Sequence, residues 1–72
     1  MARQKLKAKR LAFGLTQEEV AYGAGITRTY YTEIENGNRN CNLQIWLKIA
    51  ELLQIPESEL VSYMKDGMVK GA

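Results

Sequence analysis

The chain has 72 residues, a formal net charge of +2 and 46% hydrophobic residues, a composition typical of an ordinary globular protein. A chain of this length is expected to form one small domain, over residues 1–72, with a core of limited size. The single cysteine, Cys41, excludes an internal disulfide, and the absence of histidine argues against a zinc site. No apolar run reaches the roughly 18 residues that a membrane span requires. We therefore expect a cytoplasmic protein without a metal or other cofactor.

Positive charge is concentrated at the N-terminus. The first ten residues contain five basic side chains and no acid: Arg3, Lys5, Lys7, Lys9 and Arg10. Residues 41–72 contain three lysines and four acids, so the two ends of the chain differ in charge. This polarity suits phosphate binding at the N-terminal end. A lysine-rich, solvated first helix explains the same residues equally well.

The first predicted helix covers residues 3–13. Leu6, Arg10 and Phe13 recur at helical spacing and share one face, which we expect to point into the protein. Gly14 follows as a helix stop.

The next two predicted helices are short and joined by a tight turn. Thr16, with Glu19 three residues later, forms a capping box that starts a helix over residues 17–24. Thr27 caps another helix over residues 28–36. Two short helices joined by a turn that contains glycine are the pattern of a helix-turn-helix.

Two further helices complete the chain. Asn42 is a good N-cap for a helix over residues 43–54, and Pro56 suits the first position of a last helix, over about residues 57–66. The sequence shows no alternating strand pattern and no repeat. These signals predict an all-α fold, a compact bundle of five helices.

The third helix has two very different faces. At about 100° per residue, Tyr31 and Ile34 fall on one arc, so Tyr31 is expected to be buried and Tyr30 to lie at the rim. The opposite arc is polar and consists of Arg28, Thr29, Thr32, Glu33 and Asn36. Arginine, threonine and asparagine side chains can read base edges in DNA. An ordinary solvated surface is the alternative explanation.

Glu35 lies at the inner margin of this helix and needs a cation, because an unpaired buried carboxylate is very costly. Arg10 lies on the inner face of the first helix and can supply it. We therefore predict a structural Arg10–Glu35 ion pair between the first and third helices.

Several motifs together carry a family resemblance. The stretch "KRLAFGLTQEEVAYGAGITRTYYTEIENGNRN", followed by "LQIWLKIAELLQI", resembles the Cro/cI-type (XRE-like) helix-turn-helix family of phage repressors and bacterial transcriptional regulators. The resemblance covers roughly residues 5–60. It implies a lambda-repressor-like domain that binds double-stranded operator DNA as a homodimer, with each recognition helix in a major-groove half-site.

The resemblance also assigns roles to side chains. Base-reading positions, including the residues at the start of the recognition helix, are Thr27, Arg28, Thr29, Thr32 and Glu33. Phosphate-binding positions are Thr16, Gln17, Tyr30, Asn36, Arg39 and Asn40. Gln17 can also brace the recognition helix, and its place at a helix N-terminus independently favours phosphate.

Two residues depart from the family pattern. Cys41 stands where the family often has proline, which puts the nearby phosphate contacts in doubt. Glu33 is unfavourable beside DNA unless it accepts a hydrogen bond from a cytosine amino group or orients Arg28.

The fourth helix has more apolar surface than one core face requires. Trp46, Ile49, Ala50 and Leu53 fall on one side, which we expect in the core. A second strip and the last helix then predict a symmetric dimer interface formed by Ile45, Leu52, Tyr63 and Met68.

Other functions fit less well. The chain has no histidine, no nucleophile with an obvious base and no glycine-rich phosphate loop, so we do not expect an enzyme. A basic segment that binds a membrane is a weak alternative. No small-molecule ligand or sensor domain is evident. The main alternative is a protein-interaction module of the same fold, such as an antitoxin that neutralises a partner protein.

Overall fold

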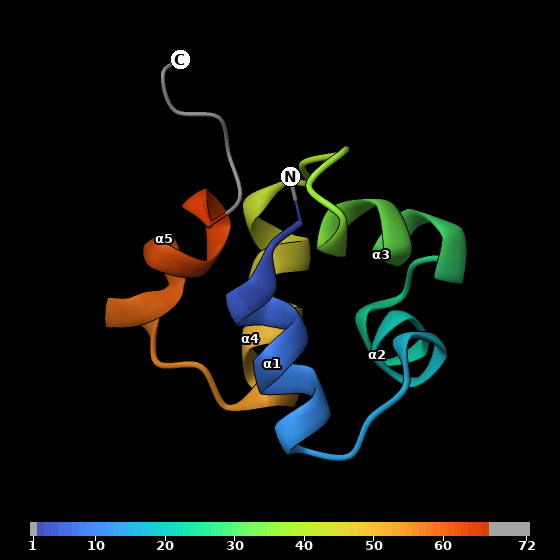
Figure 1. Ribbon diagram of the computed structural model, residues 1–72, viewed down its shortest axis with the longest axis horizontal. Helices are drawn as coiled ribbons and strands as arrows, with labels where there is room; N and C mark the ends of the chain where they lie inside the picture. Colours follow the sequence, from blue (N-terminus) through green and yellow to red (C-terminus); the bar gives the residue numbers. More distant parts are fainter. Residues whose placement is uncertain (1, 67–72) are drawn as a thin grey trace.

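Five helices account for most of residues 2–66, the part of the chain that the computed structural model describes (Figure 1). They are α1 (Gln4–Ala12), α2 (Gln17–Ala24), α3 (Arg28–Glu35), α4 (Leu43–Leu53) and α5 (Glu57–Lys65). Within these residues there is no strand, so the expected all-α, five-helix fold is confirmed. None of the five helices is long and apolar enough to cross a membrane.

Side-chain caps begin three of the helices where the sequence predicted them. The Thr16 hydroxyl accepts a hydrogen bond from the Glu19 backbone N–H at 3.1 Å, and the Glu19 carboxylate accepts one from the Thr16 N–H at 2.8 Å. Thr27 and Asn42 cap α3 and α4 with one hydrogen bond each, accepted by the side chain from the backbone N–H of Tyr30 and of Ile45. Pro56 differs from expectation, since it lies just before α5 rather than in its first position.

Two glycines allow α2 to meet its neighbours. Gly25 has a φ of 76° and ends α2 in a left-handed conformation, which glycine adopts without steric cost. At Gly23, an added Cβ would lie 2.8 Å from the side chain of Leu52, so α2 and α4 approach closely there. The turn and the close packing together fix α2 and α3 as a rigid corner against α4.

Helix α4 forms the centre of the hydrophobic core. Trp46, Ile49 and Leu53 have no exposed surface. In Figure 1, α4 lies behind α1, with α2 and α3 on one side and α5 on the other. Tyr31 and Ile34 enter this core from α3, whereas Tyr30 is half-buried, as the helical periodicity predicted. The inner face of α3 is therefore fixed, and its outer face points away from the core.

The prediction for Phe13 is wrong. Its side chain is 41% exposed because α1 ends at Ala12, one residue before it, and the chain turns away there. Lys9 lies over the Phe13 ring, with its ammonium nitrogen 5.8 Å from the ring centroid.

The apolar surface of α4 and α5 also differs from the predicted interface. Tyr63 is only 8% exposed and belongs to the core, which leaves it little surface to bury against a partner. Ile45 and Leu52 are half-buried and pack against the core, and Met68 lies outside the described residues. The exposed large apolar side chains of these two helices are instead Leu43, Leu47 and Val61.

Candidate nucleic-acid interface

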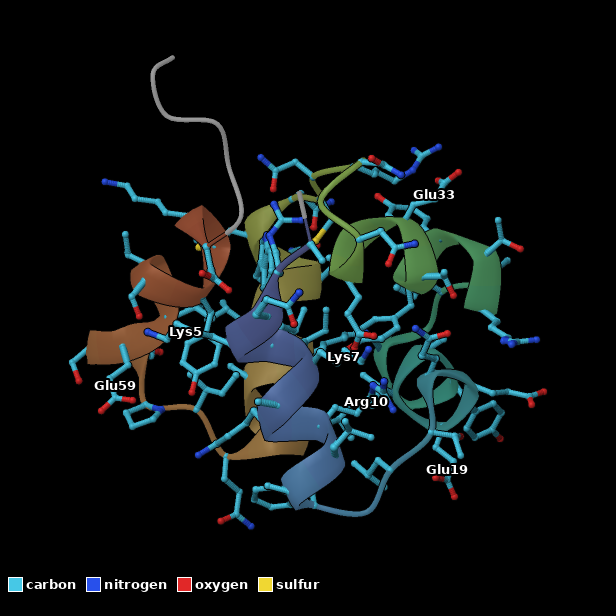
Figure 2. The ribbon with its side chains drawn as sticks, in the orientation of Figure 1. Lys5, Lys7, Arg10, Glu19, Glu33 and Glu59 are labelled. Atoms are coloured by element: carbon cyan, nitrogen blue, oxygen red, sulfur yellow. The ribbon has the colours of Figure 1, made fainter. Side chains whose placement is uncertain are left out.

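The basic N-terminus does not form a free phosphate-binding end. Arg3 and Arg10 are 2% and 6% exposed. Lys5 turns toward α5 (Figure 2), where its ammonium group donates a hydrogen bond to the Ser62 hydroxyl at 2.8 Å and lies over the Tyr63 ring. These three of the five basic residues therefore hold α1 against its neighbours. The uneven charge of the sequence reflects packing as much as surface potential.

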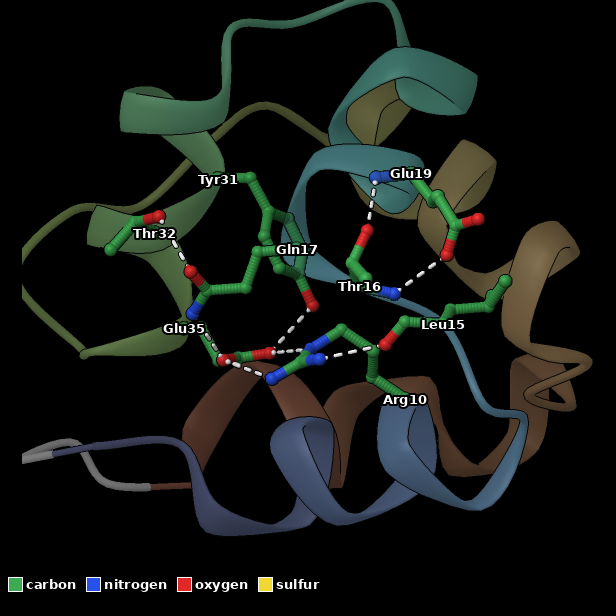
Figure 3. A network of polar contacts seen from close by, with 8 residues as sticks. All are labelled: Arg10, Leu15, Thr16, Gln17, Glu19, Tyr31, Thr32 and Glu35. Carbon is green, nitrogen blue, oxygen red and sulfur yellow. Dashed lines mark hydrogen bonds and ion pairs between the residues drawn. The ribbon is translucent and has the colours of Figure 1, made fainter.

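The predicted Arg10–Glu35 ion pair is confirmed. Arg10 Nε donates to Glu35 Oε2 at 2.8 Å, and Arg10 Nη2 donates to Oε1 at 3.1 Å, so the contact is bidentate (Figure 3). Arg10 Nη1 donates to the Leu15 carbonyl at 2.7 Å. The hydrogen bond to Glu35 raises the pKa of Arg10, which therefore remains charged. This pair joins α1 to α3 inside the protein.

Two more side chains complete the hydrogen bonding of Glu35. The Tyr31 hydroxyl donates to Oε2 at 2.9 Å, and Gln17 Nε2 donates to Oε1 at 2.8 Å. Burial alone would raise the pKa of Glu35, but the hydrogen bonds from Arg10, Gln17 and Tyr31 outweigh it and leave the pKa below its usual value. Burial, together with the neighbouring Glu35 charge, raises the pKa of Tyr31, which remains a donor.

Gln17 connects this buried network to the outer face of α3. Its amide oxygen accepts a hydrogen bond from the Thr32 hydroxyl at 3.1 Å, while its amide nitrogen binds Glu35 (Figure 3). The start of α2 is thus tied to two successive turns of α3. The bracing role expected for Gln17 is observed, and the Thr32 hydroxyl donor is already engaged in the free protein.

The predicted DNA-contacting residues of α2 and α3 lie together on one face. A shallow hollow between these helices is lined by Gln17, Arg28, Thr29, Thr32 and Glu33. A neighbouring hollow is lined by Arg10, Thr16, Gln17, Glu18 and Arg28. Thr27, Arg28 and Thr29 are exposed, whereas Thr32 and Glu33 are partly buried. The structure therefore assembles the polar arc that helical periodicity placed on the outside of α3.

Glu33 pairs with a residue that the sequence did not indicate. Its carboxylate accepts a hydrogen bond from Arg39 Nε at 2.6 Å, not from Arg28. This hydrogen bond raises the pKa of Arg39. The Arg39 guanidinium also lies over the Tyr30 ring, 4.8 Å from its centroid. Arg39 therefore connects the loop after α3 to the outer face of that helix.

Arg3 is the main structural residue that sequence reasoning missed. Its guanidinium donates to Asn40 Oδ1 at 2.9 Å and to the carbonyl oxygens of Ile34, Arg39 and Met64. It also lies 5.2 Å from the centroid of the Trp46 ring. Burial lowers the pKa of Arg3.

These contacts fix the position of the loop after α3. The Arg3 backbone N–H donates to the Glu35 carbonyl at 2.7 Å, so the arginine holds the end of α3 as well. The side-chain oxygen of Asn40 is occupied by Arg3, while Asn36 and Arg39 are exposed. A run of alternating basic residues gave no signal that this one arginine is buried.

The polar face has features that suit the binding of nucleic acid. Within residues 2–66, no group of three or more cysteine and acidic side chains is placed to hold a metal ion. The exposed start of α3 offers donors and a methyl group, which are the features that read base edges. The start of α2 adds backbone N–H groups and the positive end of a helix dipole, which favour phosphate.

Comparisons with known proteins agree with this geometry. A family model described as helix-turn-helix matches residues 6–60. The chain is 53% identical over 53 residues to the HTH-type transcriptional regulator YqaF of Bacillus subtilis, covering 74% of this chain and 70% of YqaF. It is 36% identical to the transcriptional repressor RstR of cryptic phage CTXphi from Vibrio cholerae, covering 86% of this chain but only 56% of RstR.

A solved structure is similar as well. The restriction-modification controller protein C.AhdI from Aeromonas hydrophila superposes with a TM-score of 0.73 at 41% identity. The match covers 81% of this chain and 84% of C.AhdI. The similarities in sequence and the similarity in fold therefore agree with each other.

Proposed function

This chain belongs to the helix-turn-helix family of DNA-binding transcriptional regulators, and we propose that it acts as a dimeric repressor that reads a pseudo-palindromic operator. The observation that carries the proposal is the outer face of α3, which is polar and exposed at its start and held rigidly from behind. Its similarity to a phage repressor supports a repressing role. We expect it to meet its operator in the cytoplasm of a bacterial cell.

In this proposal α3 is the recognition helix and lies in the major groove. Arg28 is exposed and can donate two hydrogen bonds to guanine, while the Thr29 methyl group can contact the methyl group of thymine. Thr27 and Thr32 flank them. Because the Thr32 hydroxyl donates to Gln17, its remaining acceptor and its methyl group are what it offers to a base.

Phosphate contacts would flank the recognition helix on both sides. Thr16 caps α2 and Gln17 is its first residue, at the positive end of the helix dipole, which attracts an anion. On the other side, Tyr30 and Asn36 lie near the loop that carries Arg39 and Asn40. Such contacts fix the register of a protein on the duplex, whereas base contacts select the sequence.

The dimer would form through an apolar groove between α4 and α5. Leu43, Leu47, Leu60, Val61 and Met64 line it, together with Glu57. Leu43, Leu47 and Val61 are exposed, and exposed apolar side chains so close together are favoured at an interface with a second copy. Two copies place two recognition helices on one side of the duplex, and one monomer alone makes too few contacts for tight specific binding at physiological salt.

The test is a selection of bound duplexes from random DNA at roughly physiological salt. We expect a pseudo-palindrome with half-site centres about 10 base pairs apart, the spacing that two-fold-related recognition helices require. Salt-sensitive binding with no enriched sequence would refute the proposal.

Sedimentation tests the dimer separately. We expect a concentration-dependent monomer–dimer equilibrium that DNA shifts toward the dimer. A monomer at high micromolar concentration, with and without the selected DNA, would refute the homodimer. The apolar groove would then favour the alternative of a protein-interaction module with a different partner.

A further inference from the structure

An acidic side chain lies within the face that is proposed to meet DNA. Glu33 projects from the outer side of α3 (Figure 2) and lines the same hollow as Arg28, Thr29 and Thr32. A carboxylate at this position repels the phosphates that border the groove, so on electrostatic grounds alone it weakens binding. It is 40% exposed, and neither burial nor a cap explains its presence.

The acid is paired with a cation from the neighbouring loop. Arg39 Nε lies 2.6 Å from Glu33 Oε1, and the Arg39 guanidinium is stacked over Tyr30. Arg39 and Tyr30 are both proposed phosphate contacts. In the free protein, therefore, the positive charge of Arg39, a proposed phosphate contact, is neutralised by Glu33, a proposed base contact.

We propose that Glu33 is a specificity-determining residue whose carboxylate exchanges Arg39 for a cytosine amino group in the cognate half-site. This inference rests on the proposed function of α3 as a recognition helix. A cytosine N4 amino group in the major groove donates a hydrogen bond to the carboxylate. Arg39 then turns from Glu33 to a backbone phosphate. A half-site without that amino group leaves Arg39 paired with Glu33, so the complex gains neither the base contact nor the extra phosphate contact.

The exchange is feasible because the pair is open to solvent. The side chains of Arg39 and Glu33 are 50% and 40% exposed, and exposed ion pairs contribute little to stability. Arg39 is held by one hydrogen bond to Glu33 and by its stacking on Tyr30, so rotation of its side chain breaks two surface contacts without opening the core. Nothing else in α3 has to move.

The exchange also makes the affinity for DNA depend on sequence. On random DNA the Arg39–Glu33 pair is close to neutral and adds no phosphate contact. On the cognate half-site Arg39 adds one contact, which steepens the dependence of log K on log salt by about one. Glu33 thus lowers non-specific binding and leaves specific binding intact, which raises the ratio between them.

The experiment compares the wild type with Glu33→Gln in the selection from random duplexes and in anisotropy titrations on one random and one selected duplex. The expected result for Glu33→Gln is loss of the preference for cytosine at one position of each half-site. Its affinity for random DNA should rise about threefold to tenfold, with a salt slope steeper by about one for each bound protomer, or about two for the dimer. Both changes follow from release of Arg39.

Two further variants act as controls. Glu18→Gln removes the same charge from an exposed acid on this face, beside Arg28 but outside the Arg39 pair, and should leave the selected sequence unchanged. Adding Arg39→Gln to Glu33→Gln should abolish the gain on random DNA, because the released cation is then missing.

The possible outcomes distinguish failure of the inference about Glu33 from failure of the proposed function of α3. An enriched palindrome that is the same for the wild type and Glu33→Gln, with equal salt slopes on random DNA, overturns the role of Glu33 alone. No enriched sequence with any variant overturns both the recognition helix and the exchange. An equal loss of base preference in Glu18→Gln would also overturn the role of Glu33. The loss would then come from removing any negative charge on this face and not from removing the carboxylate that pairs with Arg39.

Discussion

Helix α3 carries two glutamates, Glu33 and Glu35, which point to opposite faces and each pair with an arginine from another part of the chain. Inside, Arg10 Nε and Glu35 Oε2 are 2.8 Å apart, with side chains that are 7% and 2% exposed. Outside, Arg39 Nε and Glu33 Oε1 are 2.6 Å apart, with side chains that are 50% and 40% exposed. The two pairs use the same chemistry at nearly the same distance and differ mainly in their access to water.

The distance between two charged groups therefore does not by itself give the energy of an ion pair. Removing one member of the inner pair leaves a buried charge without a partner, which costs several kcal/mol. Removing one member of the outer pair leaves a charge that water solvates at once. The inner pair therefore determines how α1 and α3 pack, whereas breaking the outer pair costs little stability, as the proposed exchange of partners requires.

The largest effect is expected from breaking the inner pair. Arg10→Ala should lower the free energy of unfolding by about 3–5 kcal/mol, because Glu35 then lies buried among hydrogen-bond donors without its cation. Urea denaturation followed by circular dichroism measures this. Since a small domain can lose most of its stability in this way, Arg10→Lys provides a milder variant.

Arg10→Lys keeps the charge but loses the planar fork, so its stability should fall between those of the wild type and Arg10→Ala. A loss below about 1 kcal/mol in Arg10→Ala would contradict the assignment. The packing of α1 against α3 would then depend on apolar contacts such as those of Leu6.

Substitution of a third arginine, Arg3, should lower the free energy of unfolding by an amount between those expected for the two pairs. Arg3 is as buried as Glu35, but its acceptors are carbonyl and amide oxygens rather than a carboxylate. Arg3→Ala leaves several of them unsatisfied and should cost about 2–3 kcal/mol in the same urea experiment. Lys7→Ala, an exposed residue of α1, is the matched control and should stay within about 0.5 kcal/mol of the wild type. Equal effects of the two variants would show that Arg3 is not a structural residue.

The contrast between these arginines also shows what the sequence could predict. The inner pair follows from helical periodicity, because the 3.6-residue repeat places Glu35 and Arg10 on faces that must be buried. The caps Thr16, Thr27 and Asn42 are local signals of the same kind. Such features need only a few neighbouring residues to be recognised.

Contacts between distant parts of the chain were not predictable in this way. Arg3 reaches Arg39 and Asn40 across more than thirty residues, and a basic run looks the same whether its members are buried or solvated. The Arg39–Glu33 pair depends on how the loop after α3 folds back, and no periodic pattern describes a loop. The interface expected at Ile45, Leu52, Tyr63 and Met68 remains a prediction, but periodicity could not show that the path of α5 covers Tyr63 and leaves Val61 exposed.

The smallest effect is expected from the outer pair, and it bears most directly on function. In a double-mutant cycle of Glu33→Gln and Arg39→Gln, the coupling in the free energy of unfolding should lie within the error of the measurement, because both side chains are solvated. The effects of the two substitutions on the free energy of unfolding should therefore add, while Glu33→Gln alone should bind random DNA more tightly than the other three proteins. A clear coupling in stability would mean that the pair is rigid in the free protein. Arg39 could then not leave Glu33 for a phosphate without a cost that binding would have to offset, and the proposed exchange would lose its physical basis.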